Sequence, residues 1–277
     1  MHKRNATLYD TEPPMTAIPV KPVATLTGSA VGAAIFLVPR ILAGHSGVLI
    51  LLAVYTGIVL IAYIIGTVTI GGIAGEFFRG LLIGATAAMN WAVASILYSK
   101  LFGTPVGTVF AVIAGVYPFL SIFPFLSRNS VYSGLLGYLN WLLPMSWLVV
   151  ALGFSFFLLG LLGALIGRAG VTFFQLERIA FHWQTGTLFT KGGWISNLNP
   201  IDTAFNMGNF AFADVKFGEM AEDHESGHTL NLAAFGSAFH LIGAFDENVI
   251  HGAEAFSERL AESHVPNTTA PTLAMWG

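Results

Sequence analysis

The sequence contains no cysteine. This absence excludes disulfide bonds, thiolate zinc sites and a cysteine nucleophile. Charged residues are also scarce: they make up 10% of the 277 residues, where a typical soluble domain has roughly 25%. Hydrophobic residues account for 55% of the chain. An ordinary soluble fold is therefore not expected, because so few charged side chains cannot cover its surface.

The scarcity of charge is greatest between Pro22 and Gly167. The charged side chains in this interval are Arg40, Glu76, Arg79, Lys100 and Arg128. Uncharged runs of about twenty residues separate most of them, which is long enough for a helix to cross a bilayer. We expect five spans, at about 24–43, 47–72, 79–98, 105–126 and 143–167. The sequence therefore predicts a multi-span α-helical membrane domain at 23–167, preceded by a flexible polar tail at 1–22.

Three further features concern the membrane. The first span is rich in glycine, alanine and threonine, so we expect it to pack through small side chains. Residues 131–143 are too short to span and fit an interfacial helix before Pro144. Basic residues slightly favour an external C-terminal part: with the N-terminus inside, the inner side would hold Lys3, Arg4, Lys21, Arg79 and Arg128, and the outer side Arg40, Lys100 and Arg168.

The charge balance reverses after Gly167. Residues 1–167 carry a net charge of +4, and the remainder carries −7. The pattern also becomes strand-like: we expect strands at 171–176 and 179–184, a hairpin at 186–195 that turns at Lys191-Gly192-Gly193, and a strand at 205–213 with a bulge at Gly208. Helices are expected at 216–235, ending at Gly236, and at 248–263. This pattern predicts a small α+β domain at 168–265 and a loose tail at 266–277.

The expected helix at 216–235 contains His224-Glu225-Ser226-Gly227-His228, an H-E-x-x-H motif. Two histidines four residues apart face the same side of a helix, so both imidazoles can reach one Zn²⁺. Glu225 would then act as the general base on a zinc-activated water and pass the proton to the leaving amine. A catalytic site of this kind needs a third protein ligand.

The helix at 248–263 supplies candidates for that ligand, because His251, Glu254, Glu258 and Glu262 recur along it at spacings of three and four. Here Glu258-Arg259-Leu260-Ala261-Glu262 resembles the E-x-x-A-D pattern of gluzincin-type membrane zinc metallopeptidases, similar to the prenyl-protein and heat-shock-associated proteases, with Glu in place of Asp. The resemblance implies a zincin-like fold, with Glu258 as third ligand and Glu262 as the carboxylate that orients a zinc histidine. Glu254 is the alternative.

Other polar residues have simpler interpretations. His240 and His251 are expected to be structural or to support the ligands, and Asn90 and Asn140 to form interhelical hydrogen bonds. By analogy with zincins, the segment 206–212 would be an edge strand that binds substrate.

The sequence therefore favours an integral-membrane zinc endopeptidase that acts near the bilayer surface on peptides or membrane proteins, with no nucleic-acid partner. A non-enzymatic transporter or scaffold with a regulatory C-terminal domain is the alternative, although no acidic residue lies deep within a predicted span. A membrane di-iron desaturase or hydroxylase is disfavoured, since it needs several histidine-rich boxes and the chain has eight histidines.

Overall fold

The computed structural model describes residues 21–43, 47–198, 204–214, 219–264 and 272–276. The expected N-terminal tail lies almost entirely outside these ranges. Five helices are long and apolar enough to cross a membrane, namely Pro22–Leu42, Val48–Thr69, Ile73–Phe102, Thr104–Ile122 and Pro144–Gly167. Their positions agree with the five expected spans to within several residues. The chain has the features of a multi-span membrane protein.

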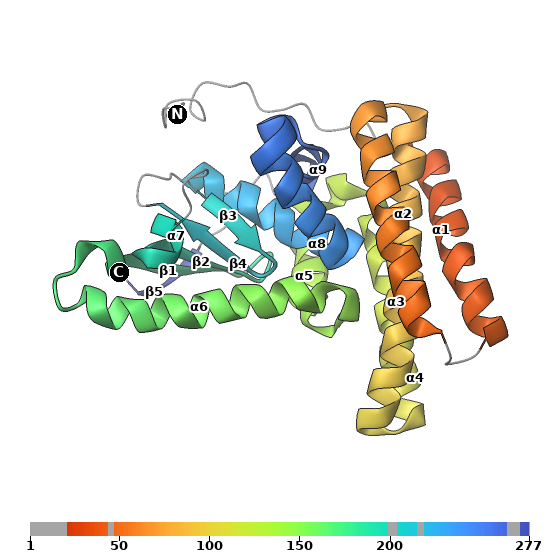
Figure 1. Cartoon of the computed structure of the whole chain (residues 1–277), viewed down its shortest axis with the longest axis horizontal. Helices are drawn as coiled ribbons and strands as arrows, with labels where there is room; N and C mark the ends of the chain where they lie inside the picture. The colour runs from red at the N-terminus through yellow and green to blue at the C-terminus, as the bar shows by residue number, and fades with distance from the viewer. Residues whose placement is uncertain (1–20, 44–46, 199–203, 215–218, 265–271, 277) are drawn as a thin grey trace.

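Helices α1 (Pro22–Ala43), α2 (Val48–Thr69), α3 (Ile73–Phe102) and α4 (Thr104–Val116) lie side by side, with α3 at the centre (Figure 1). The contact between α1 and α3 depends on glycine. A Cβ added at Gly28 would lie 1.9 Å from the Phe77 carbonyl oxygen, and one at Gly80 would lie 2.0 Å from that of Thr25. The expected packing of the first span through small residues is confirmed.

Helix α6 (Trp147–Gly167) runs across the direction that α1–α4 share (Figure 1). Helices arranged in this way cannot all follow one membrane normal. Most of α6 is nevertheless exposed, and its exposed residues are apolar around much of its circumference. A helix of this composition requires apolar surroundings, which lipid supplies.

A mixed sheet lies against α6 (Figure 1). Its strands are β1 (Leu176–His182), β2 (Thr187–Gly192), β3 (Ala204–Met207), β4 (Phe210–Ala213) and β5 (Thr272–Trp276), in the order β3-β4-β2-β1-β5. Strands β2 and β4 pair in parallel, and the other neighbours pair antiparallel. Strand β3 is therefore at one edge of the sheet.

Several sequence-based boundaries in this region were wrong. The segment 171–176 contains a 3₁₀ turn at Thr172–Phe174, and the hairpin turn precedes β2 because Gly193 begins a short helix, α7 (Gly193–Leu198). The expected strand at 205–213 is a β3–β4 hairpin, since Gly208 adopts φ 76° and reverses the chain rather than forming a bulge. The end of the expected loose tail forms β5 and pairs with β1.

The two expected C-terminal helices also differ from the structure. Helix α8 (Glu219–Asp246) is interrupted at Gly236, with φ 74° and ψ 178°, but continues beyond this glycine. The expected helix at 248–263 is divided into a π-helix (Glu247–His251), a 3₁₀ turn (Gly252–Glu254) and α9 (Phe256–His264). Gly252, at φ 61°, separates the first two of these pieces.

Part of α8 and one face of α9 pack against the membrane helices. Phe235, Phe239 and Phe256 belong to one hydrophobic core with Tyr55 and Val59 of α2. The interruption at Gly236 leaves the Phe235 carbonyl without its helical partner, and the hydroxyls of Tyr55 and Thr86 donate to it at 2.9 and 3.2 Å. The sheet-bearing part therefore shares its core with the membrane helices.

Two buried asparagines add hydrogen bonds between segments. The Asn140 amide, in the turn after helix α5 (Ser130–Tyr138), donates to the Thr229 carbonyl of α8 at 2.8 Å. The Asn90 side-chain oxygen accepts from the Met145 amide at 2.9 Å. Both asparagines thus link different segments by hydrogen bonds, as expected.

Candidate metal centre

Helices α8 and α9 bring three potential ligands together. His224 and His228 lie one turn apart on α8, and Glu258 lies in the first turn of α9. The Nε2 atoms of the two histidines are 3.2 Å apart, and the Glu258 Oε2 atom lies 2.9 Å from Nε2 of His224 and 3.2 Å from Nε2 of His228. These three residues form a group that could hold a metal ion.

The size of this triangle fits a single small cation. Ligand atoms that share a tetrahedral zinc ion at about 2.0–2.1 Å lie roughly 3.3 Å from one another. The three measured separations fall close to that value, before any adjustment of side-chain rotamers. Two imidazoles and one carboxylate also leave a fourth coordination position for water or substrate, as catalytic sites require.

Glu262 orients one of these imidazoles. Its Oε1 atom lies 2.6 Å from Nδ1 of His224, one helical turn beyond Glu258 on α9. When Nδ1–H donates to this carboxylate, the Nε2 atom of a neutral imidazole keeps its lone pair directed at the cluster. The arrangement fits the supporting role that the resemblance implied for Glu262.

The electrostatics of the cluster indicate a place for positive charge. Burial opposes protonation of His224, but hydrogen bonds to Glu258 and Glu262 outweigh this effect and raise its pKa well above 6.5. Burial would raise the pKa of the Glu258 carboxyl, yet the neighbouring His228 and His224 hold it well below its usual range. A cation in the triangle would take over the balancing charge that a proton on histidine otherwise provides.

Glu225 lies beside the ligands without belonging to the triangle. It is 6% exposed, and it lines the same cavity as His228 and Glu258. The Asn206 amide of β3 donates to the Glu225 main-chain carbonyl at 2.8 Å and to the Thr229 hydroxyl at 3.1 Å. Strand β3 is thereby fixed against α8 at the position of the potential base.

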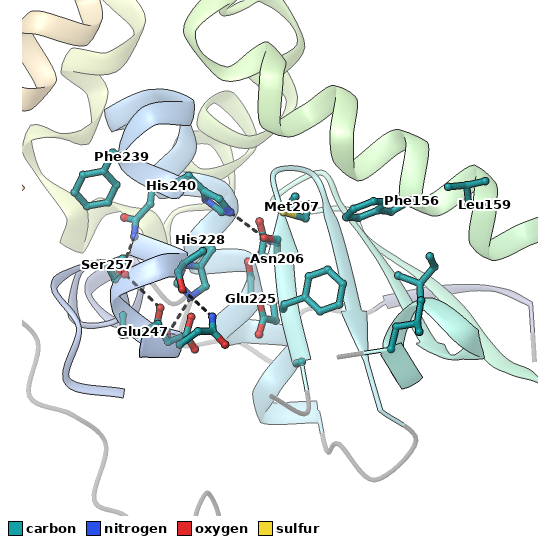
Figure 2. A pocket seen from close by; sticks show the side chains of 18 of the residues that line it. Phe156, Leu159, Asn206, Met207, Glu225, His228, Phe239, His240, Glu247 and Ser257 are labelled. Carbon is teal, nitrogen blue, oxygen red and sulfur yellow. Dashed lines mark hydrogen bonds and ion pairs between the residues drawn. The ribbon is translucent and has the colours of Figure 1, made fainter. Parts of the chain in front are cut away.

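The cavity has a volume of about 470 Å³ and extends from the cluster of potential ligands to α6 (Figure 2). Its polar lining near the cluster includes Glu225, His228 and Glu258. Apolar side chains line the remainder, among them Phe156 and Leu159. The volume falls in the range of small-molecule and peptide-side-chain sites, so the candidate centre has a place for an apolar ligand beside its open coordination position.

His240 occupies part of the cavity wall rather than the cluster. Its Nε2 atom donates to the Asn206 main-chain oxygen at 2.8 Å, and burial lowers its pKa to about 4, so the ring is neutral near pH 7. This hydrogen bond also occupies one carbonyl of the edge strand. The strand that was expected to bind substrate is thus present at the sheet edge, but the Asn206 carbonyl already has a partner.

The expectation that Glu254 lies one turn before Glu258 on the same helix face is wrong. Glu254 is exposed and ends the 3₁₀ turn, and Ala255 separates it from α9. His251 is likewise outside the cluster: its Nδ1 atom lies 2.5 Å from Asp246 Oδ1, and its side chain is largely exposed. The break at Gly252 explains both positions, because it interrupts the helical spacing on which the prediction depended.

A set of supporting contacts was missed by the sequence analysis. The Tyr63 hydroxyl of α2 donates to Asp246 Oδ2 at 2.8 Å and accepts from the Ser257 amide at 3.3 Å. Ser257 immediately precedes Glu258 and places its hydroxyl 3.5 Å from Glu258 Oε1. The Asn231 amide donates to the Ser257 carbonyl at 3.1 Å. A membrane helix and α8 therefore both hold the start of α9, which carries the third potential ligand.

Comparisons with known proteins identify no relative, as no protein-family model, no curated protein and no solved structure matches the chain. The geometry of the site and the two short motifs that form it are therefore the guides to function.

Proposed function

We propose that this protein is a membrane-bound zinc-dependent endopeptidase. The observation that carries the proposal is the convergence of His224 Nε2, His228 Nε2 and Glu258 Oε2 within hydrogen-bonding distance of one another, with Glu225 beside them. Two imidazoles and a carboxylate are a donor set of catalytic zinc sites. The same convergence supports the gluzincin resemblance, because Glu258 lies beside both histidines and Glu262 contacts His224.

Each residue has a distinct task in this proposal. His224, His228 and Glu258 would hold the ion, and Glu262 would fix the ring of His224. A bound zinc ion would polarise the scissile carbonyl and lower the pKa of water towards about 7. Glu225 would take a proton from the attacking water and deliver it to the leaving amine, for which its place next to His224 on α8 is suited.

Among the residues that the structure describes, the alternative with two iron ions has no second set of ligands. In the part of the chain that the structure describes, the only group of three or more metal-binding side chains within coordination reach is His224, His228 and Glu258. This group suits one ion.

Zinc analysis and hydrolysis together test the proposal. We expect about one zinc per purified chain, and loss of that zinc in the His224→Ala, His228→Ala double variant. Glu225→Gln should retain the metal and the fold but lose hydrolysis of a membrane-protein substrate, because it removes the base and leaves the ligands in place. Full zinc content in the double variant, or wild-type turnover by Glu225→Gln, would overturn the assignment.

A further inference from the structure

The two ends of the cavity differ in exposure. Near the potential metal ligands the lining of the cavity is buried: Glu225 and Glu258 are 6% and 3% exposed. At the far end Leu159 of α6 and Leu198 of α7 are 42% and 56% exposed. The cavity therefore opens beside α6 and α7, and the side chains that these two helices place at its mouth are apolar. The Trp194 indole of α7 donates to the Leu159 carbonyl at 3.0 Å, which holds the two helices together at this mouth.

The surface next to the mouth is also apolar. Leu158 and Leu162, on either side of Leu159 along α6, are 44% and 62% exposed. On the side of α8, Ala244, Glu247 and Asn248 line the cavity, and the nearby Phe245 and Val249 are 60% and 64% exposed. Large apolar side chains exposed together on both sides of a cavity mark a surface that water does not normally cover.

The potential metal ligands lie alongside the membrane helices rather than beyond their ends. Tyr63, which holds Ser257 next to Glu258, comes six residues before the end of α2 at Thr69. At 1.5 Å per residue, this places Tyr63 about 9 Å inside the helix end. Gly66, still nearer that end, packs against Phe256 at the start of α9. The first turn of α9 therefore lies at the depth of the second half of α2.

We propose that the cavity opens laterally into the hydrocarbon region of the bilayer, and that the substrate is an apolar peptide segment embedded in the membrane. Such a segment would pass between α6 and the end of α8 to reach the cluster without crossing an aqueous surface. The position of the mouth does not depend on catalysis. The identity of the substrate rests on the proposed peptidase function.

The absence of cysteine permits a direct test of the mouth. The single variants Leu159→Cys and Phe245→Cys would carry a nitroxide spin label in proteoliposomes of the full chain, and relaxation of the label by oxygen would be compared with relaxation by a water-soluble nickel chelate. Leu60, exposed on α2, provides the lipid reference, and Glu177, exposed on β1, provides the aqueous reference. Both mouth labels should match Leu60. If they match Glu177 instead, the mouth faces water and the proposal fails.

A pair of substrates tests whether the substrate is an apolar segment embedded in the membrane. Both would contain the same cleavable sequence, one within an apolar segment that inserts into vesicles and one flanked by charged residues that keep it in solution. We expect at least tenfold faster cleavage of the inserted substrate. Faster cleavage of the soluble substrate would overturn the substrate class. Absence of zinc and of all cleavage, with lipid-like mouth labels, would reject the peptidase function and with it the substrate, but not the lateral mouth.

Matched variants on α6 connect the two measurements. Leu159→Trp narrows the mouth, whereas Leu165→Trp adds the same ring at a position that is 64% exposed and does not line the cavity. We expect the first variant to retain zinc and lose at least fivefold of its cleavage of the inserted substrate, and the second to cleave it normally. Equal rates in the two variants would show that this mouth is not the route.

Discussion

Gly227 of α8 lies directly against Ala261 of α9. A Cβ added at Gly227 would be 2.4 Å from the Ala261 carbonyl oxygen and 3.2 Å from its Cα atom. Both residues belong to the motifs that predicted the site, one within H-E-x-x-H and the other within the segment from Glu258 to Glu262. Their small size lets the two helix backbones approach closely enough for three ligands to meet.

Gly227→Ala should therefore disrupt the cluster although it changes no ligand. The added methyl group meets backbone, so α9 must move away from α8, at a cost of about 1–3 kcal/mol for overpacking. We expect lower thermal stability and a marked loss of zinc affinity. Gly57→Ala in α2 is the control, because a Cβ there meets nothing within 4 Å. Wild-type zinc affinity in Gly227→Ala would contradict this account.

The two carboxylates of α9 should contribute unequally to metal binding. We expect Glu258→Ala to abolish tight binding, since it removes a ligand. Glu262→Ala should weaken binding by roughly 10–100-fold through loss of the orienting hydrogen bond to His224. Exposed Glu254→Ala serves as the control and should bind normally. Competition with a zinc chelator would measure zinc affinity in all three variants, and loss of metal in the Glu254 variant alone would contradict the assignment of Glu258 as a ligand.

Tyr63→Phe should affect the site from a membrane helix. The change removes the hydroxyl that donates to buried Asp246 and accepts from the Ser257 amide. Leaving such groups without partners costs about 1–3 kcal/mol. We expect a lower unfolding temperature and weaker zinc binding. Tyr138→Phe removes a hydroxyl from a more exposed ring, 42% exposed, and should change zinc binding little; equal effects of the two variants would argue against a specific role for Tyr63.

His264 should make stability depend on pH. The side chain is fully buried, and burial together with the charge of Arg79 lowers its pKa to about 3. Because an unfolded histidine titrates near 6.5, the unfolded state binds a proton first as pH falls. Stability should be complete well above pH 6.5 and decrease towards pH 3, by up to about 1.4 kcal/mol per pH unit.

His264→Gln tests this dependence, since its side chain does not titrate. Unfolding in detergent would be followed between pH 7.5 and 4.5. The variant should show a shallower loss of stability over this range than the wild type. The slope should not vanish, because buried His182 also has a pKa lowered to about 4. Identical slopes would show that His264 is not the titrating group.

The crossing of α6 affects membrane topology. Four helices, α1–α4, share a direction, whereas α6 runs across them. We therefore expect four crossings, with reporters fused to the two ends of the chain on the same side of the membrane. Five crossings would place the reporters on opposite sides. Reporter activity in cells distinguishes these outcomes and does not depend on the metal.

The sequence was most informative where a short-range pattern determines the structure. The spans follow from long uncharged runs, and the spacing of His224 and His228 places both on one face of a helix. The approach of Glu258 was expected only from the family resemblance, because no local pattern indicates which distant helix contacts α8. The contacts of Tyr63 and Asn231 with Ser257 were missed for the same reason.

The errors in the sheet have a similar origin. Gly192 and Gly193 both adopt positive φ, so the signal for a turn was genuine, but it joins β2 to a helix rather than to a strand. Strand β5 pairs with β1 about ninety residues earlier in the chain, and only that pairing makes Thr272–Trp276 a strand. Local propensity contains no information about such a partner.

The interruption of α8 at Gly236 determines whether the site can be separated from the rest of the protein. A fragment that begins after Gly167 would lose Tyr55 and Thr86, and the Phe235 carbonyl would be left without donors in an apolar environment. Such a fragment should not fold, and grafting residues 219–264 onto a soluble carrier should not transfer metal binding. Recombination could therefore transfer the site to another protein only together with the membrane helices that surround it.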